Sequence, residues 1–452
     1  MMGQQSRKES LFYYFRLEDQ IPETHLLRQI DRYVDFSFVR DRLKGFYSQT
    51  GRPSIDPEVL LRLLLVSYLY GITSERRLLE DVRMHLAYRW FTRLDFDQEI
   101  PDHSTFSKNR HGRFRQSGVF RTVFEEIVRR CLAAGLVEGR HLTVDGTLVE
   151  ADASPQSRVP REQLAEVARL SRTVQEYLAE VEQQNPVADP AEPLPVVAET
   201  VSTTDPDAAW AVKWGRAALA YYDNYLIDTP SRVILAVDAT PARFRQESVA
   251  ARRMLEHVEQ LGLRPESLGA DTAYGGGEFL AWLLARGIQP HIPVIDHSHQ
   301  TGQRFTRDQF RYVPDENAYY CPAGQPLRYR GLSRAGHGYI YSSTAAQCQA
   351  CPQKSRCTRG PARRLFVHWQ EPARQTVRAL VGTPAYVRSQ RTRYTIEALF
   401  GELKQRIRLR RVRLRRLWNV AEQFLLAATA QNLKRLVRFL ARGHPSPASS
   451  TP

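Results

Sequence analysis

The stretch that decides the fold is Arg391-Thr-Arg-Tyr-Thr-Ile-Glu-Ala-Leu-Phe-Gly-Glu-Leu-Lys-Gln405. Its apolar residues recur at three- and four-residue spacing, which predicts one amphipathic helix with a buried stripe made of Ile396, Leu399, Phe400, Leu403 and Ile407. At about 100° per residue, four polar residues fall within about 60° of each other on a neighbouring face, namely Arg393, Glu397, Lys404 and Arg408. Glu402 points the opposite way and is expected to be ordinary solvent-exposed surface. The pattern indicates either one carboxylate ringed by cations or a plain salt-bridged surface helix.

The composition is that of a globular protein with a basic surface. At 452 residues two or three structural units are expected. The 64 Lys and Arg outnumber the 49 Asp and Glu, giving a net charge of +15. That excess favours a polyanionic partner, most commonly nucleic acid, although a generally basic protein is the alternative. The charge is also concentrated, because eight cations fall between positions 404 and 416: Lys404, Arg406, Arg408, Arg410, Arg411, Arg413, Arg415 and Arg416.

No export or membrane signal is visible. The longest largely apolar run, Leu63 to Ile72, is too short to span a bilayer. Five cysteines are an odd number in a long chain without an export signal, which argues against a disulfide framework. The expected location is the cytoplasm, in association with the nucleoid, and no membrane partner is expected.

The N-terminal part, residues 1 to 135, is expected to be helical. Asp56 followed by Pro57 is a helix start, and Val59 to Tyr70 is almost continuously apolar, as in a buried helix. A second helix is expected from Ser74, and Pro101 to Arg110 is expected to lead into a basic helix. Several short basic helices suit a DNA-binding domain of the helix-turn-helix kind, or a helical bundle for dimerisation.

The middle of the chain predicts a mixture of strands and helices. His141 to Val149 alternates as a strand should, and the segment 153–220 is expected to be a helical and linker insertion. The order then is a hairpin from Tyr225 to Asp238, a helix from Glu247, a short strand ending at Asp271, a helix and a last strand. A long helix from Val420 to Leu440 is expected to pack on the sheet.

Two carboxylates follow short strands, and a third lies on the helix quoted above. Asp145 and Asp271 each precede a turn of small residues, and Glu397 would approach from the helix. Three carboxylates converging on one end of a sheet suit two Mg²⁺ ions, since Mg²⁺ prefers hard oxygen ligands, and such ions support in-line phosphoryl displacement. Asp238, Glu150 and Asp152 are competing acids between which the sequence alone does not choose firmly.

Three blocks carry a resemblance to a known family. They are Val144-Asp145-Gly-Thr-Leu-Val-Glu-Ala-Asp-Ala-Ser154, Gly269-Ala-Asp271-Thr-Ala-Tyr274 and Arg393-Tyr-Thr-Ile-Glu397-Ala-Leu-Phe-Gly-Glu-Leu-Lys404. The chain resembles bacterial insertion-sequence transposases of the DDE, ribonuclease H-like superfamily, the group with a helical N-terminal domain and a four-cysteine insertion. It departs from the pattern at Ala273, where the family usually has Gly, and at Gln390, where the family often has Tyr. Tyr386 and Tyr394 are the candidates to replace that Tyr.

The resemblance implies a catalytic triad and a DNA partner. Asp145, Asp271 and Glu397 would be the catalytic residues and would hold two Mg²⁺ ions, with Mn²⁺ as the alternative. Five cations are expected to contact DNA, namely Arg393, Lys404, Arg408, Arg410 and Arg411. The implied function is a transposase that binds its element's terminal inverted repeats, cuts the DNA and transfers the strand. Element-end and target duplexes would be the partners of a homodimer in a synaptic complex. The alternatives are a catalytically silent DNA-binding regulator and a nuclease without strand transfer.

Four of the five cysteines cluster in one segment. Cys348 and Cys351 form a CxxC pair, Cys357 follows, and Cys321 would complete a tetrahedral site for a structural Zn²⁺. His297 and His299 are reserve ligands, and reduced thiols or a redox pair are the alternatives. Cys131 is expected to be buried packing.

These observations predict a multi-domain α/β protein. It has an all-α N-terminal domain (1–135) and a ribonuclease H-like mixed-sheet catalytic core (136–300). A cysteine-containing, zinc-type insertion (301–385) follows, then C-terminal catalytic helices (386–440) and a disordered tail (441–452).

Overall fold

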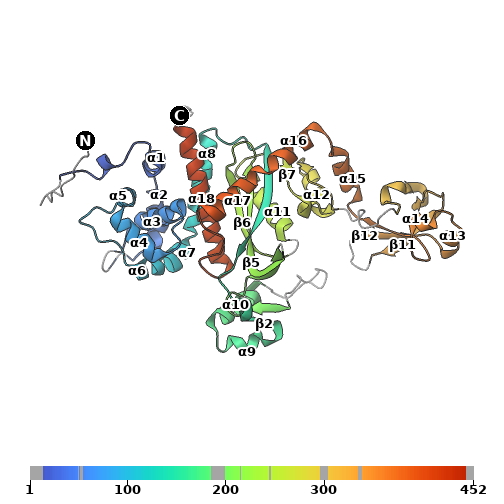
Figure 1. Ribbon diagram of the computed structural model, residues 1–452, viewed down its shortest axis with the longest axis horizontal. Helices are drawn as coiled ribbons and strands as arrows, with labels where there is room; N and C mark the ends of the chain where they lie inside the picture. Colours follow the sequence, from blue (N-terminus) through green and yellow to red (C-terminus); the bar gives the residue numbers. More distant parts are fainter. Residues whose placement is uncertain are drawn as a thin grey trace, which may run out of the picture.

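The computed structural model describes residues 14–48, 50, 54–184, 199–213, 215–243, 246–295, 304–333 and 338–443. Residues 185–198 of the linker predicted from Asn185 to Pro206, the reserve ligands His297 and His299, and the tail from residue 444 lie outside these residues. The end of that linker is wrong as a prediction, because Thr200–Ser202 form strand β3. Figure 1 shows the N-terminal helices at one end of the molecule, a mixed sheet in the middle and a small β-rich unit at the other end. The fold is therefore α/β, as predicted.

The N-terminal part is helical, as predicted. Asp56 caps helix α3 (Pro57–Tyr70) by accepting a hydrogen bond from the Glu58 backbone N–H at 2.8 Å, and the helix ends at Gly71 in a left-handed conformation. The other helices are α1 (Leu26–Tyr33), α2 (Phe38–Leu43), α4 (Glu75–Met84), α5 (Leu86–Phe91), α6 (His103–Asn109), α7 (Arg115–Ser117) and α8 (Val119–Ala133).

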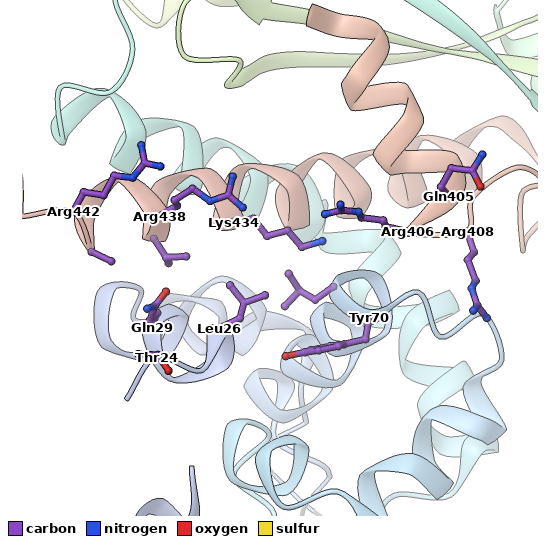
Figure 2. A pocket seen from close by; sticks show the side chains of 13 residues that line it. Thr24, Leu26, Gln29, Tyr70, Gln405, Arg406, Arg408, Lys434, Arg438 and Arg442 are labelled. Atoms are coloured by element: carbon purple, nitrogen blue, oxygen red, sulfur yellow. The ribbon is translucent and has the colours of Figure 1, made fainter. Parts of the chain in front are cut away.

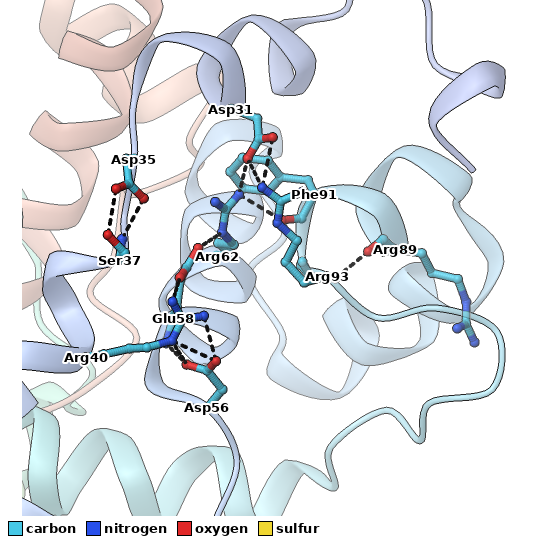
Figure 3. A network of polar contacts seen from close by, with 11 residues as sticks. Asp31, Asp35, Ser37, Arg40, Asp56, Glu58, Arg62, Arg89, Phe91 and Arg93 are labelled. Atoms are coloured by element: carbon cyan, nitrogen blue, oxygen red, sulfur yellow. Dashed lines mark hydrogen bonds and ion pairs between the residues drawn. The ribbon is translucent and has the colours of Figure 1, made fainter. Parts of the chain in front are cut away.

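A buried ion network ties α1 and α3 together (Figure 3). The Arg62 side chain is only 2% exposed, and it contacts Glu58 at 2.7 Å and Asp31 at 2.7 Å. It also donates to the Phe91 carbonyl oxygen at 3.0 Å. Arg40 lies at the outer end of the network, where its half-exposed side chain contacts Glu58 and Asp56. Arg62 is therefore the one cation of this network whose removal would leave charges in a dry interior.

Replacing Arg62 with Met is expected to lower the free energy of unfolding by up to about 3–5 kcal/mol, because Glu58 and Asp31 would lose their buried partner and keep only the half-exposed Arg40 and Arg93. Urea denaturation followed by far-UV circular dichroism measures the loss. Arg40→Met is the matched control, and it should cost only about 1 kcal/mol, since the Arg40 side chain is 48% exposed. Equal losses for the two variants would contradict the assignment of Arg62 as the central cation.

The central sheet is mixed. Its strands are β1 (His141–Glu150), β4 (Ala209–Lys213), β5 (Arg216–Asp228), β6 (Ile234–Pro241), β7 (Ser267–Gly269) and β8 (Gln289–His291). Strand β1 pairs antiparallel with β5 and parallel with β7, and β7 pairs parallel with β8. On its other edge β5 pairs antiparallel with β4 and β6. The predicted strand at 141 and the hairpin of β5 and β6 are confirmed.

Helices cover the sheet and join it to the N-terminal part. They are α11 (Gln246–Gln260), α12 (Gly277–Ala285), α15 (Glu371–Leu380), α16 (Pro384–Arg393), α17 (Thr395–Gln405) and α18 (Leu417–Leu440). Helix α18 packs on β6 and also on α8 and α3. As a result, one hydrophobic core runs from the N-terminal helices through α18 into the sheet. Cys131 on α8 is fully buried in that core, as predicted.

Two excursions leave the sheet. The first holds β2 (Arg158–Pro160), α9 (Leu164–Ala168), α10 (Arg172–Gln184) and β3 (Thr200–Ser202), and the central sheet resumes at β4. The second holds a five-stranded antiparallel sheet with its own small core. Its elements are β9 (Arg311–Val313), β10 (Ala318–Tyr320), β11 (Pro326–Leu332), β12 (Gly338–Ser342), α13 (Ala345–Gln349), α14 (Lys354–Cys357) and β13 (Arg364–His368). In the part of the chain described, no helix is long and apolar enough to cross a membrane.

The helix predicted from Arg391 to Gln405 is two helices, and that prediction is wrong in two respects. Helix α16 ends at Arg393 and α17 begins at Thr395, so Arg393 and Glu397 do not share one helix. Arg408 lies beyond α17 with a φ of +61°, which also takes it off the predicted helical face. The apolar stripe was identified correctly, because its five residues are buried.

Glu402 is not ordinary surface, which corrects the third part of that prediction. Its side chain is 15% exposed and contacts Lys434 at 3.1 Å and Arg435 at 3.4 Å. Both cations lie on α18, which packs along this side of α17. A helical wheel of one segment could not show this, because the covering helix comes from a later part of the chain.

Candidate active site

Asp145 and Asp271 lie at the same edge of the sheet. Thr143 on β1 is the register partner of Gly269 on β7, and the two strands are parallel. Asp145 and Asp271 each follow two residues later. Asp271 caps a short 3₁₀ helix (Thr272–Tyr274), and its carboxylate accepts from the Ala273 N–H at 2.9 Å. The fold thus brings together two carboxylates that are far apart in sequence.

Helix α17 carries Glu397 in its first turn and packs on β1. Its far end is fastened by Lys404, whose ammonium donates to the Thr147 hydroxyl at 2.7 Å. In its middle, the Phe400 ring packs on Tyr225 with centroids 5.1 Å apart. Glu397 itself is exposed. The third predicted carboxylate is thus presented to solvent on a helix that is anchored to the strand of the first.

Arg393 joins the end of α16 to Asp145. Its guanidinium lies 3.6 Å from the Asp145 carboxylate, and both side chains are mostly buried. The Arg393 guanidinium also stacks on the exposed ring of Tyr394, 4.9 Å from its centroid. Arg393 is therefore fixed at the site rather than free on the surface.

Gln390, at the position where the family often has Tyr, makes structural bonds. Its side-chain amide donates to the carbonyl oxygens of Ala270 and His291. Tyr386 is buried against the His291 ring, whereas Tyr394 is 59% exposed next to Arg393. Of the two candidate replacements, only Tyr394 is accessible to a ligand.

A buried tyrosine lies close to the carboxylates. Tyr274 is 1% exposed, and its hydroxyl has no hydrogen-bond partner among the described residues. Burial raises the pKa of Tyr274 well above its usual range, and the negative charges of Asp145, Glu247 and Asp271 raise it further. The same field acts on Tyr222, whose pKa is raised by burial and then by Glu247 and Asp271. The carboxylates of Asp145, Glu247 and Asp271 therefore lie close enough to the buried Tyr274 to act on its hydroxyl.

Glu247 is an acidic neighbour that the sequence analysis did not single out. It lies in the first turn of α11, and a Cβ atom on Gly146 would be 3.8 Å from its carboxylate oxygen. The same Cβ would be 2.7 Å from the Asn224 side-chain oxygen, so Gly146 allows a close approach here. No local pattern around Glu247 distinguishes it from the other acids of an amphipathic helix.

The three competing acids are held in ion pairs elsewhere. Asp238 contacts Arg253 at 2.6 Å. Glu150 contacts Arg411 at 3.0 Å, and Asp152 contacts Arg415 at 3.2 Å. None of these three acids is among the charges that raise the pKa of Tyr274, which are those of Asp145, Glu247 and Asp271.

The basic segment after α17 is only partly available to a ligand. Arg411 and Arg415 are used in the pairs just given, and Arg413 stacks on Tyr68 with its guanidinium 4.5 Å from the ring centroid. Arg416 is buried and contacts Asp207 and Glu180. By contrast, Arg406, Arg408 and Arg410 are exposed. Much of the charge density seen in the sequence therefore serves the fold.

The four cysteines of the second excursion line one small cavity of about 20 Å³. Cys357 is 8% exposed, and burial raises the pKa of its thiol, as do the neighbouring thiols of Cys321, Cys348 and Cys351. All four are free of disulfides. Across the described ranges, however, no three Cys, His, Asp or Glu side chains are gathered closely enough to hold a metal ion. The structure brings the predicted cysteines together without forming a closed ligand cage.

Two regions of the chain match known families. Residues 15–112, the N-terminal helices, match the family described as Transposase domain (DUF772). Residues 320–437 match the family described as Transposase DDE domain. The second match includes the four cysteines and Glu397, whereas Asp145 and Asp271 lie between the two matched regions.

Among solved structures, the chain is similar to the cryo-EM structure of a piggyBac transposase synaptic complex with hairpin DNA. The identity is 10%, the TM-score is 0.33, and the match covers 94% of this chain and 74% of that chain. A superposition this loose carries no argument about fold or mechanism. The two family matches, together with the three sequence blocks, define the chain as a DNA transposase. Within that class it is an insertion-sequence DDE transposase.

Proposed function

We propose that the chain binds the terminal inverted repeats of its own element, cuts the DNA there and transfers the 3′ end to a target. The observation that carries this proposal is the placement of Asp145 and Asp271 at one edge of two adjacent parallel strands, with α17 and Glu397 packed on the first of these strands. The strand order β6-β5-β1-β7-β8, with only β7 and β8 parallel to β1, supports a ribonuclease H-like core. A single acidic edge with a basic neighbour suits phosphodiester chemistry on DNA.

The donor chemistry of the three acids fits a hard divalent cation. Asp145, Asp271 and Glu397 offer carboxylate oxygens, which Mg²⁺ prefers and Mn²⁺ accepts. Asp145 and Asp271 are partly buried and Glu397 is exposed. No three acidic side chains are gathered closely enough to hold a metal in the described residues, so Glu397 would have to approach the two aspartates when the ions bind. When bound, two such ions would activate the attacking oxygen and stabilise the leaving one.

The remaining residues of the site would bind and orient the DNA. Arg393 and Lys404 lie on either side of Glu397 along the chain, and both are fixed by contacts to β1 at Asp145 and Thr147. Such fixed cations suit the phosphates that flank the scissile bond. Arg408 and Arg410, which are exposed, would contact the duplex further out, and Arg411 would do so only by leaving Glu150.

The four cysteines would hold a structural Zn²⁺. Thiolate sulfur suits zinc, and the four side chains line a cavity of about 20 Å³ in a unit with a small core of its own. No three metal-ligating side chains are gathered at binding distance in the described residues, so metal binding would have to draw the four thiols together. The metal would stabilise this unit rather than take part in the reaction.

The experiment that tests the function uses the purified full-length protein, Mg²⁺ and a duplex carrying the DNA that flanks its gene. Gels score binding, cutting and joining separately. Joined product supports the transposase reaction, and cutting without joining would instead indicate a nuclease. Binding without cutting under Mg²⁺ or Mn²⁺ would indicate a DNA-binding regulator. Two copies acting in a synaptic complex are also proposed, and sizing of the protein–DNA complex by light scattering tests this.

A further inference from the structure

A basic cleft separates the N-terminal helices from the C-terminal catalytic helices (Figure 2). It has a volume of about 780 Å³. One wall comes from the start of α1 and the end of α3, including Thr24, Gln29 and Tyr70. The other wall comes from the end of α17, the segment after it and the end of α18. The cleft thus lies between the two regions that match transposase families.

The charge of the cleft has one sign. Its lining includes five cations and no acidic residue: Arg406, Arg408, Lys434, Arg438 and Arg442. Lys434 is paired with Glu402 at 3.1 Å. For the other four, no ion pair with a carboxylate is found within the described part of the chain, and all four are exposed. Their charge is therefore available to an anion from outside.

The two walls are held in close contact at one end. A Cβ atom on Gly71, at the end of α3, would lie 2.2 Å from the Arg406 carbonyl oxygen, so the two backbones touch. Gly71 has a φ of +67°, and Arg408, two residues after the Arg406 carbonyl, has a φ of +61°, so the chain is in a left-handed conformation at both positions. The guanidinium groups of Arg406 and Arg408 are thus presented at a fixed junction rather than on a loose loop.

We propose that this cleft binds the phosphate backbone of duplex DNA, at a place separate from the carboxylate site. The inference rests on the proposed function insofar as the ligand is the DNA of the transposition reaction. Lys434, Arg438 and Arg442 follow one another at four-residue steps, and Figure 2 shows them in a row above Gln29 and Leu26. In a helix such a step is about 6 Å, and a DNA duplex carries one phosphate per strand for about every 3.4 Å of its axis, so each cation of the row can meet a separate phosphate. An extended polyanion matches this row better than a compact ligand does.

The position of the cleft gives the binding a role. Gln405 and Arg406 directly follow Lys404, and Gln405 lies about 12 Å along α17 from Glu397, since eight residues of helix rise about 1.5 Å each. DNA held here would contact α1 of the N-terminal part and α18 of the catalytic part at the same time. The cleft would therefore fix the duplex relative to the cutting site without contributing to the chemistry.

The test compares two double variants of the full-length protein. Arg438→Gln with Arg442→Gln removes two charges from the cleft. Arg140→Gln with Arg264→Gln removes two exposed charges just before β1 and β7, at the end of these strands opposite to the carboxylates. Fluorescence anisotropy measures the affinity for an element-end duplex and a random duplex between about 50 and 200 mM salt.

We expect the cleft variant to bind both duplexes at least about tenfold more weakly at low salt. Its slope of log affinity against log salt should be smaller by about 1.8, since each lost phosphate contact removes about 0.9. The control variant should keep the wild-type slope. Thr24→Glu, on the opposite wall, should also weaken binding, which tests the cleft without removing any arginine. Circular dichroism of each variant confirms that it is folded.

The proposal would be overturned if the cleft variant kept the wild-type slope of log affinity against log salt. It would also be overturned if the cleft and control variants lost the same amount of affinity for duplex DNA. Weaker binding of single-stranded DNA or RNA only, with the duplex unaffected, would overturn it as well. The anisotropy measurement needs no cleavage, so its outcome does not depend on the proposed reaction. Failure of the wild type to cut, with the slope difference intact, would therefore count against the proposed reaction and not against the cleft.

Discussion

Replacing Glu397 with Gln is expected to reduce DNA cleavage by on the order of 10³-fold or more while leaving DNA binding unchanged. The substitution keeps the size of the side chain and removes the negative charge that would help to hold the divalent ions. Because Glu397 is exposed and makes no packing contribution to the stripe of α17, the fold should not be disturbed. Gel assays with a labelled element-end duplex measure cutting and binding in the same samples.

Glu150→Gln is the matched control for this prediction. Glu150 lies on β1 with Asp145, but its carboxylate contacts Arg411 near the surface. The control should therefore cut within a few-fold of the wild type, whereas Asp145→Asn and Asp271→Asn should behave like Glu397→Gln. If Glu397→Gln cuts at the wild-type rate, or if only Glu150→Gln loses cleavage, then an acid other than Glu397 is the third metal ligand.

The second large effect is expected from loss of the cysteine site. Purified protein should contain about one Zn²⁺ per chain, and Cys351→Ser should lose it and open the small unit to proteases. The effect should be large because structural zinc contributes about 10–16 kcal/mol of binding free energy in small domains with little core. The core of this unit is small, comprising Phe305, Phe310, Tyr319, Leu327, Tyr341, Cys357, Leu365 and Val367. Metal analysis and limited proteolysis with mapping of the first cut measure the two outcomes.

Cys131→Ala is the control, since Cys131 lies in the separate main core. It should keep its zinc and its protease resistance within residues 304–368. If the wild type contains no zinc and Cys351→Ser is cut no faster than the wild type, the cysteines are reduced thiols that pack around the cavity, which is the alternative that their sequence pattern left open.

Much of the local structure could be read from the sequence. Asp56 and Pro57 predicted the start of α3, and the alternation from His141 predicted β1, because caps and side-chain periods act within a few residues. The carboxylates proposed for catalysis were also chosen from the sequence, with the help of the family resemblance. The structure brings Asp145 and Asp271 to one edge, and their catalytic role stays a prediction until the variants are tested.

The remaining features depended on contacts between distant segments. Wheel geometry assigned Glu397 and Glu402 to different faces but could not show that α18 would cover Glu402. Nor could it show the break at Tyr394, which separates Arg393 from Glu397. The sequence showed a dense run of cations but not their partners: Arg411, Arg413, Arg415 and Arg416 contact other parts of the protein.

The sequence by itself determined the candidate groups, namely three carboxylates, a set of cations and four thiols, together with most of the helices and strands that bear them. Only the tertiary structure decided which of these groups face one another. It placed Glu247 beside Gly146, and it formed a cleft between α1 and α18 whose cations come from the segment after α17 and from the end of α18. The reason is physical: hydrogen-bonding pattern and side-chain period are properties of short segments, whereas exposure and electrostatic neighbours are properties of packed pairs of segments.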